Sequence, residues 1–515
     1  MFSKLYQIDR WLIVVAVIVS LALSLWGNIV DDIVNNDGIE YIKSAQAILQ
    51  GDWLLAIQTY KWPFYSSIMA FISAASGLSL ENSAYLFNAI CYAWLVLAFI
   101  ALVHVLGGNR TTLWFAVLVI LAFPTLNKFR PYLIRDPAFY ALFLSGCYAF
   151  FVYIKYGQLK YNLIAIICFT LGALFRVEGA IYLFVTQAYL LNQHLFVRVN
   201  RTVGILVVFA LLLVIIVLIS WWQFSPKNDL TYLSIFSSPV QFMETAWIQV
   251  FDQISRRLHA IDTKVLVGYS RGYSAIVLVW SAMTIVFSEL IHSLYYLYFV
   301  LWFVAWRKKL LFPVTALYRP WRYIIVIALF ILLSFVGVKW FLSERYPLTV
   351  SLLLLLATPF LLAHWYEKVT FKGTHKRVFY GVMALVILSG IKSVDLQTNK
   401  LYLKQAGYWM AENIPSGKTV YSNNRILTYY FGRKARNDQY WHQWKFFKRA
   451  GRRAKVRYDY AAIQIHHKNP GYIDRLPHTL KSKVVATFVN DKGSLVYVID
   501  FSQQLQSDWP KLRGE

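Results

Sequence analysis

The chain has 515 residues, of which 58% are hydrophobic and 15% are charged. About 25% charged residues is usual for a soluble domain, so the composition excludes an ordinary soluble protein and predicts an integral membrane protein with a smaller soluble part. The net charge of +26 would suggest nucleic acid in a soluble chain, but much of the excess lies in short loops between apolar runs, so no nucleic-acid partner is expected.

Apolar runs through residue 393 predict about 11 membrane spans. They are expected near 11–29, 84–106, 111–125, 136–154, 161–175, 178–193, 203–223, 275–304, 323–342, 347–365 and 378–393. The first run follows Lys4 and Arg10 and is long for a signal peptide, so we expect a retained anchor. The predicted fold class is an α-helical polytopic membrane domain over 1–393, followed by a small α/β domain over 394–515.

The charges of the loops predict an orientation with the N-terminus in the cytoplasm. Five loops then face the cytoplasm, and their only acid is Glu367. Their basic residues are Arg110, Lys155, Lys160, Arg198, Arg201, Arg307, Lys308, Lys309, Arg319, Arg322, Lys368, Lys372, Lys376 and Arg377. The loops around Asp37, Asp136, Glu178, 224–274 and Glu344 are predicted to lie together on the extracytoplasmic side, with the C-terminal tail.

The first outer loop, 30–83, is long and begins with an amphipathic pattern. Ile39, Ile42, Ala45 and Leu49 recur at helical spacing, which predicts an interfacial helix that Gly51 ends. Residues 61–65 then turn the chain into a second short helix.

Asp37 opens this helix and is the leading candidate for a catalytic carboxylate. Tyr41 lies one helical turn later and is expected to share its face, as a substrate-binding residue. Asp31, Asp32 and Glu40 compete for the catalytic role. The alternative is that all of these acids are solvated loop charges.

The second outer loop carries Lys128, Arg130, Arg135 and Asp136, followed by Pro137. Asp136 suits the N-cap of a helix whose first turn contains Pro137, which is the structural interpretation. The functional interpretation makes Asp136 a second catalytic acid that activates an acceptor or holds a metal ion. Arg130 or Arg135 would then hold the phosphate, and Lys128 is expected to be a further substrate-binding residue.

Two further charged elements interrupt apolar runs on the predicted outer side. Arg176 and Glu178 either pair with one another or line a cavity, with Arg176 as a phosphate ligand. Arg345 is a second candidate phosphate ligand, and Tyr346 suits an interface anchor that contacts substrate.

The tail from 394 predicts a helix over 401–413 and strands near 419–421, 458–465, 484–489 and 495–499. Basic residues outnumber acidic ones and are densest between Lys445 and Arg457. That cluster is either a solvated face or a contact for anionic headgroups.

Carboxylates beside cations at a membrane surface suit an enzyme that acts on a lipid-phosphate sugar. Such an enzyme deprotonates an acceptor, neutralises the departing phosphate and leaves the isoprenoid tail in lipid. No cofactor is required by the sequence, and a divalent metal ion stays an open alternative. His104, His259, His292 and His364 lack metal-ligand spacing.

In these residues the chain resembles the polytopic glycosyltransferases of the GT-C class, and most of all the bacterial protein-mannosyltransferase-like branch that includes aminoarabinose transferases. The resemblance rests, in chain order, on Asp37, Tyr41, Ala45, Leu49, Gly51 and Pro63, then Arg135-Asp136-Pro137, Arg176-Val177-Glu178-Gly179 and Glu344-Arg345-Tyr346-Pro347. Family members often have Asp-Glu where this chain has Asp37-Gly38, and Lys where it has Arg176.

The resemblance implies a GT-C fold in a bacterial inner membrane, with a periplasmic C-terminal domain. It also implies a polyprenyl-phosphate sugar donor and transfer at the periplasmic face to a lipid, glycan or protein acceptor. Asp37 would correspond to the first-loop catalytic acid.

Two other functions fit a polytopic protein. A transporter or flippase predicts inverted repeats and charges at mid-membrane depth, whereas no repeat is evident and most charges cluster at one face. A polysaccharide polymerase or ligase that uses polyprenyl-linked glycan would also use outer-loop arginines.

Overall fold

The computed structural model describes residues 9–30, 33–195, 239–369, 373–394, 400–432, 436–437, 458–467 and 483–501. The chain divides into two compact units. The first contains Met1–Asn28 and Tyr41–Asp395, and the second contains Ile29–Glu40 and Leu396–Glu515. The second unit therefore joins the start of the first loop to the C-terminal segment.

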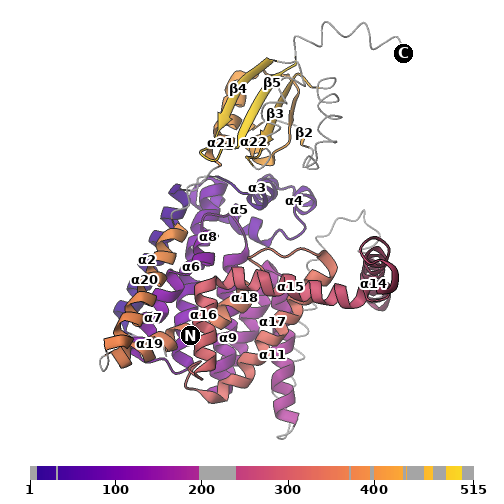
Figure 1. The fold of residues 1–515 in the computed structure, drawn as a ribbon. Coiled ribbons are helices and arrows are strands. Elements are labelled where there is room, and N and C mark those ends of the chain that lie inside the picture. The colour runs from indigo at the N-terminus through magenta and orange to yellow at the C-terminus, as the bar shows by residue number, and fades with distance from the viewer. Residues whose placement is uncertain are drawn as a thin grey trace, which may run out of the picture. The chain divides into compact units, whose positions relative to one another are not determined.

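Helices make up the described part of the chain as far as residue 394 (Figure 1). They are α2 (Arg10–Val30), α3 (Asn36–Leu49), α4 (Trp53–Thr59), α5 (Phe64–Ser76), α6 (Leu80–Val105), α7 (Arg110–Leu121), α8 (Pro124–Lys128), α9 (Asp136–Tyr156), α10 (Leu159–Phe175), α11 (Glu178–Leu195), α14 (Pro239–Lys264), α15 (Ser274–Leu294), α16 (Tyr296–Arg307), α17 (Tyr318–Lys339), α18 (Leu348–Leu355), α19 (Thr358–Val369) and α20 (Gly373–Val394), with short 3₁₀ turns η1 (Gly268–Ser270) and η2 (Thr315–Leu317).

Among the described residues, 8 helical segments are long and apolar enough to cross a bilayer. These segments are Arg10–Val30, Leu80–Val105, Arg110–Lys128, Asp136–Tyr156, Ser274–Leu294, Thr315–Lys339, Leu348–Lys368 and Lys376–Val394. The prediction of a multi-pass membrane protein is therefore confirmed.

Every predicted span coincides with one or two helices, except 203–223, which lies outside the described residues. The prediction of one continuous span over 275–304 is wrong, because Tyr295 has a φ of 64° and separates α15 from α16. A tyrosine in the left-handed region ends the hydrogen-bonded ladder of a helix, and apolarity alone does not reveal such a break. Predicted spans 111–125 and 347–365 each contain two helices, α7 with α8 and α18 with α19, which together form one membrane-length segment in each case.

The core of the first unit is centred on α9, whose residues from Asp136 to Tyr153 are all buried. Small residues let neighbouring helices approach it. A Cβ on Gly146 of α9 would lie 2.7 Å from the ring of Phe169 in α10. The ring of Phe143, one turn earlier in α9, packs against that of Tyr182 in α11, at 4.6 Å between centroids.

The loops meet at two opposite ends of this bundle. At one end, Gly157 after α9 and Arg319 at the start of α17 line a common cavity of ≈ 440 Å³. At the other end, the loop before α9 contacts the turn after α10 and the loop before α18. This grouping agrees with the loop sides predicted from charge, while the orientation in the membrane stays a prediction.

The first loop is more helical than predicted. The amphipathic pattern forms α3, and the second short helix forms α5. Between them lies α4, which the sequence analysis missed. Its N-cap is Asp52, whose carboxylate accepts a hydrogen bond from the Leu55 amide at 2.9 Å. Gly51 has a φ of 78° and so lets the chain turn between the two helices.

The second unit is a mixed sheet with two helices. Its strands are β1 (Val420–Ser422), β2 (Arg436–Asn437), β3 (Tyr460–Ile465), β4 (Lys483–Val489) and β5 (Leu495–Asp500), and its helices are α21 (Leu401–Asn413) and α22 (Arg425–Phe431). The strand order is β2-β1-β3-β5-β4. Strand β1 is parallel to β2 and β3, whereas β5 is antiparallel to both β3 and β4. The predicted helix and all four predicted strands are confirmed.

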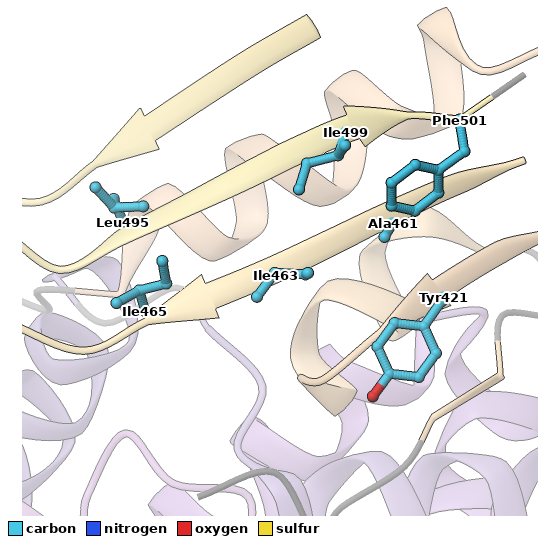
Figure 2. Packing of buried hydrophobic residues seen from close by; sticks show 7 residues of the cluster. All are labelled: Tyr421, Ala461, Ile463, Ile465, Leu495, Ile499 and Phe501. Atoms are coloured by element: carbon cyan, nitrogen blue, oxygen red, sulfur yellow. The ribbon is translucent and has the colours of Figure 1, made fainter. Parts of the chain in front are cut away.

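One face of this sheet carries a compact apolar cluster (Figure 2). Its members are Tyr421, Ala461, Ile463, Ile465, Leu495, Ile499 and Phe501. The alternate residue Gln464 points to the opposite face, where its side-chain amide donates to the hydroxyl of Tyr402 in α21 at 2.7 Å. The period-two alternation of β3 therefore divides its side chains between the cluster and α21.

Asp459 ties three strands together at one edge of this domain. Its carboxylate accepts hydrogen bonds from the Thr419 amide at 2.8 Å and from Lys418 at 3.1 Å, and its carbonyl accepts one from the Phe501 amide at 2.8 Å. Burial raises the pKa of Asp459, but the hydrogen bonds from Thr419 and Lys418 outweigh burial and hold that pKa below its usual value.

We expect Asp459→Asn to weaken the domain, because hydrogen bonds to a charged acceptor contribute about 1.5–3 kcal/mol. The wild-type contribution is present above the unfolded-state pKa of about 3.9 and is lost as the pH falls through the lower folded value. Hydrogen exchange of β1 and β3 amides in the full-length protein should be faster in the variant at neutral pH. Asp491→Asn, in an exposed turn, is the matched control, and equal exchange in the two variants would contradict the assignment.

Candidate functional site

Asp136 is the first residue of α9 and is only 3% exposed. The sequence analysis expected it to be the N-cap, but that position is occupied by Arg135, which makes no side-chain cap. The Asp136 carboxylate is paired with Arg176 instead. Its position in the first turn of α9 also favours a negative charge, because the positive end of the helix dipole lies there.

Arg176 lies at the break between α10 and α11 and is buried with its partners. One guanidinium nitrogen binds Asp136, and another binds Glu178 at 2.5 Å. The guanidinium lies 4.7 Å from the ring centre of Tyr346 and 5.4 Å from that of Phe139. The expected pairing of Arg176 with Glu178 is confirmed, and the structure adds Asp136 and two aromatic faces to it.

Gly179 explains why this break is so tight. A Cβ at that position would lie 2.6 Å from the carbonyl carbon of Gly172 and 2.8 Å from the Cα of Ala173, both in α10. The first turn of α11 thus touches the backbone of α10, which only glycine allows. Gly179 is the glycine of the Arg-x-x-Gly motif. Its close approach to α10 fixes the position of the turn that carries Arg176.

Arg345 approaches the same carboxylate from the loop before α18. Its guanidinium is 3.9 Å from Asp136, which is an ion pair but longer than a hydrogen bond. The backbone carbonyl of Arg345 accepts a hydrogen bond of 2.5 Å from the hydroxyl of Tyr140, one turn into α9. Tyr140 therefore fixes the loop against α9 while the Arg345 side chain is about a quarter exposed.

Tyr346, next in the chain, lies close to both arginines. Its ring centre is 4.7 Å from the guanidinium of Arg176 and 5.6 Å from that of Arg345. Its ring also packs on Phe335 of α17, at 4.8 Å between centroids. The Tyr346 ring therefore contacts both guanidinium groups and also packs against α17.

Lys128 binds a residue that the sequence analysis did not select. Its ammonium group is 2.6 Å from the carboxylate of Glu344, and both side chains are more than a third exposed. Glu344 precedes Arg345, so this pair joins the end of α8 to the same loop. A third charge, Glu289 of α15, lies within electrostatic reach of both.

Arg130 is directed away from this cluster. Its guanidinium donates to the Ser20 carbonyl at 3.1 Å, the Ser24 hydroxyl at 2.9 Å and the Asn127 side chain at 2.9 Å, and it stacks on Tyr92. Burial lowers the pKa of Arg130 to about 10, so it stays charged at neutral pH. These contacts join α2, α6 and α8, so the Arg130 guanidinium has a structural role, and the structure does not bring it to the cluster around Asp136.

Tyr41 packs in an aromatic group with Tyr60 and Tyr65, at 4.7 and 4.9 Å between ring centroids. Arg135 extends this group, because its guanidinium is 5.6 Å from the ring centre of Tyr60. Burial raises the pKa of Tyr41 well above its usual value, although the charge of Arg135 opposes the shift. Tyr41 is thus a protonated hydroxyl at neutral pH, within electrostatic reach of Asp136.

Asp37 lies in the first turn of α3 and is half-buried. By its packing it belongs to the second unit, whereas Tyr41, one turn later, belongs to the first. The competing acids Asp31 and Asp32 lie outside the described residues, as does the basic cluster Lys445–Arg457. Glu40 forms an ion pair with Arg425, in the second unit.

The structure therefore brings together five of the predicted residues, Asp136, Arg176, Glu178, Arg345 and Tyr346. Tyr140 and Phe139 complete the group and were not predicted. Tyr140 had a signal in the sequence, since it lies four residues after Asp136 and shares its helix face. Among the described residues, no group of three or more His, Cys, Asp or Glu could hold a metal ion.

A largely apolar cavity of ≈ 710 Å³ lies between α2, α7 and α20. Its walls include Leu23, Trp26, Leu118 and Ile391, and its polar residue is Asn127 of α8. Asn127 immediately precedes Lys128, so α8 connects the wall of this cavity to the loop of Glu344 and Arg345. All three wall helices belong to segments that could cross a bilayer, and the cavity therefore suits a hydrocarbon chain.

No family model matches the chain, and no curated protein sequence matches it. Among solved structures, the crystal structure of ArnT from Cupriavidus metallidurans in the apo state is similar, with a TM-score of 0.41 and 11% sequence identity. The match covers 94% of this chain and 97% of that chain. The proposal below depends on the side-chain contacts described above.

Removing one partner of the buried pair should be costly. We expect Asp136→Asn to lower the free energy of unfolding by about 1.5–3 kcal/mol, because it removes one of the two carboxylates that bind the buried Arg176 guanidinium. Glu344→Gln, in the half-exposed pair with Lys128, should cost under about 1 kcal/mol. Thermal unfolding in detergent can be followed with a thiol-reactive dye, since Cys91, Cys147 and Cys168 are free and buried. Equal destabilisation by the two variants would contradict this account of the site.

The close approach at Gly179 gives a second test with the same assay. Gly179→Ala should destabilise the protein by about 1–3 kcal/mol, because its methyl group overlaps the α10 backbone. Gly381→Ala in α20 is the control, since a Cβ there meets nothing within 4 Å. Unchanged stability of the Gly179→Ala variant would show that the two helices separate without cost.

Proposed function

We propose that this protein is a membrane glycosyltransferase that moves a sugar from a polyprenyl-phosphate donor to an acceptor at the extracytoplasmic face. The acceptor is a lipid, a glycan or a protein of the cell envelope. The observation that supports the proposal is the convergence of Arg176 and Arg345 on Asp136, beside an aromatic ring and at one end of a bundle of membrane-spanning helices.

Two guanidinium groups that share one carboxylate are arranged to bind a second anion. Arg345 is 3.9 Å from Asp136, so this ion pair is longer than a hydrogen bond. A phosphate oxygen in the same region would gain charge-assisted and bidentate contacts, which the planar guanidinium fork favours. Arg135 adds positive charge within electrostatic reach of Asp136, and Lys128 is paired with Glu344, next to Arg345 in the chain.

The reaction that we propose is a direct displacement at the anomeric carbon. The acceptor oxygen forms a bond to that carbon while the bond from the carbon to the phosphate oxygen breaks. The electron pair leaves with the phosphate, whose growing negative charge Arg176 and Arg345 stabilise. The acceptor proton passes to a carboxylate, for which Asp37 stays the candidate.

Asp136 is better suited to positioning than to accepting that proton. Two guanidinium groups beside it favour its charged form, and an acid so stabilised is a weak base. In the proposal, Asp136 and Glu178 hold Arg176 in place, and the Tyr346 ring lies close to both guanidinium groups. Tyr41 offers a protonated hydroxyl that can donate to a sugar or phosphate oxygen.

The apolar cavity between α2, α7 and α20 supplies a place for the isoprenoid tail. Its ≈ 710 Å³ are bordered by Trp26, Leu118 and Ile391, with no charged residue in its lining. A polyprenyl chain there would remain in a hydrocarbon environment, and α8 would lead from the cavity toward Lys128 and Arg345. Donors with a chain too short to fill the cavity are then expected to bind less tightly.

The decisive assay uses the full-length protein in lipid nanodiscs with a panel of polyprenyl-phosphate and polyprenyl-diphosphate sugars. Extracted envelope lipids and glycans serve as acceptors, and mass spectrometry detects the transferred sugar. We expect transfer from a monophosphate donor, and a loss of about 100-fold in kcat for Arg345→Gln, because removing one stabilising donor typically has that effect. Asp37→Asn should also remove most of the activity.

Arg319→Gln is the matched control, since Arg319 lies at the opposite end of the bundle. Its activity should equal that of the wild type. Full activity in Arg345→Gln would contradict the proposed phosphate site, and full activity in Asp37→Asn would remove Asp37 from the mechanism. Activity with diphosphate-linked glycans alone would favour a polymerase or ligase.

A further inference from the structure

The segment that carries Asp37 is attached at both of its ends to the C-terminal domain. On one side of Asp37, the backbone amide of Val34 donates a hydrogen bond to the hydroxyl of Tyr430 at 3.0 Å. On the other side, the carboxylate of Glu40 is paired with Arg425 at 2.8 Å. Asp37 is three residues from each of these anchors, and both partners belong to α22.

All of these residues belong to the same compact unit, which includes Ile29–Glu40 and the C-terminal segment. Ile33, Val34 and Ile39 of the loop segment are 1–4% exposed. Such a short segment has no core of its own, and its two anchors are residues of the C-terminal domain.

The helix that holds the segment is itself rigidly fixed. Asn424 caps α22 by accepting hydrogen bonds from the Ile426 and Leu427 amides, and its amide group donates to the side chain of Gln464 in β3 at 2.6 Å. A polar side chain that caps a helix and also binds a central strand ties the helix to the sheet.

Tyr430 is fixed from the opposite side by α21. A Cβ on Gly407 of α21 would lie 2.6 Å from the Cβ of Tyr430, so the two helices are in contact at this point. The ring of Tyr408 packs against that of Tyr430 at 5.4 Å, and the ammonium group of Lys404 lies 5.3 Å from its centre. The hydroxyl of Tyr430 is therefore held at a defined position relative to the sheet.

We propose that the C-terminal domain positions the catalytic loop, with Arg425 and Tyr430 as positioning residues that hold the first turn of α3 and hence Asp37. The proposal rests on the proposed function for the role of Asp37, but the attachment itself is independent of any activity. The domain would fix the Asp37 carboxylate for proton transfer, and loss of either anchor would let α3 fray from its N-terminus.

The first experiment measures hydrogen exchange of amides 33–40 in the full-length protein, and so does not depend on activity. Arg425→Glu should accelerate exchange there, because it places two carboxylates together where a pair existed. The double variant Glu40→Arg with Arg425→Glu should restore protection. Lys492→Glu is the control, with the same change of charge at an exposed position of the same domain. Wild-type exchange in Arg425→Glu would overturn the attachment.

The second experiment measures transfer kinetics for the same variants. A misplaced catalytic group lowers kcat by about ten- to a hundredfold with a smaller effect on KM, and the charge-swapped pair should recover most of kcat. Tyr430→Phe, which lacks the hydroxyl that Val34 contacts, should also lower kcat. In the Asp37→Asn background, Arg425→Glu should have no further effect, because both changes act through one carboxylate.

Additive effects of Arg425→Glu and Asp37→Asn would overturn the positioning role, as would a kcat in Arg425→Glu equal to that of the wild type. Failure of the charge swap to recover kcat, with exchange restored, would assign Glu40 a chemical role in place of an anchoring one. Absence of transfer in the wild-type protein would contradict the proposed function, while the exchange data would still decide whether the attachment exists.

Discussion

The structure of the candidate site depends on one interaction, the burial of the Arg176 guanidinium between two carboxylates. A charge in a bundle of apolar helices is tolerated only with partners, and removing it from water carries a large desolvation penalty. Asp136 and Glu178 offset that penalty, while Tyr346 and Phe139 cover the faces of the guanidinium. The interaction thereby joins α9, the turn between α10 and α11, and the loop before α18 into one group.

Backbone packing decides where that guanidinium can be. Gly179 brings the start of α11 against the backbone of α10, and Tyr140 fixes the loop of Arg345 against α9. With these two constraints, the second arginine stops at 3.9 Å from Asp136. Two guanidinium groups thus lie around one carboxylate, and this arrangement is the geometric basis of the proposed function.

The C-terminal domain shows a similar relation between a scaffold and a short attached segment. Its sheet is stabilised by the apolar cluster of Figure 2 on one face and by α21 on the other. On this base, α22 presents Arg425 and Tyr430 to the start of α3. A membrane enzyme of the proposed kind benefits from such an arrangement, because a soluble domain can hold an interfacial helix more firmly than the helix holds itself.

The sequence alone determined the features that depend on local composition. Apolar runs identified the membrane helices, and period-two alternation identified β1, β3, β4 and β5. Isolated charges singled out Asp136, Arg176 and Arg345, which the structure brings together. The tertiary structure decided which of these charges meet, because pairs such as Asp136 with Arg345 are separated by most of the membrane domain in sequence. The tertiary structure also showed that Arg130 binds α2, which depends on its packing partners. It showed that the 275–304 run is two helices separated at Tyr295, which depends on one backbone angle that hydrophobicity does not encode.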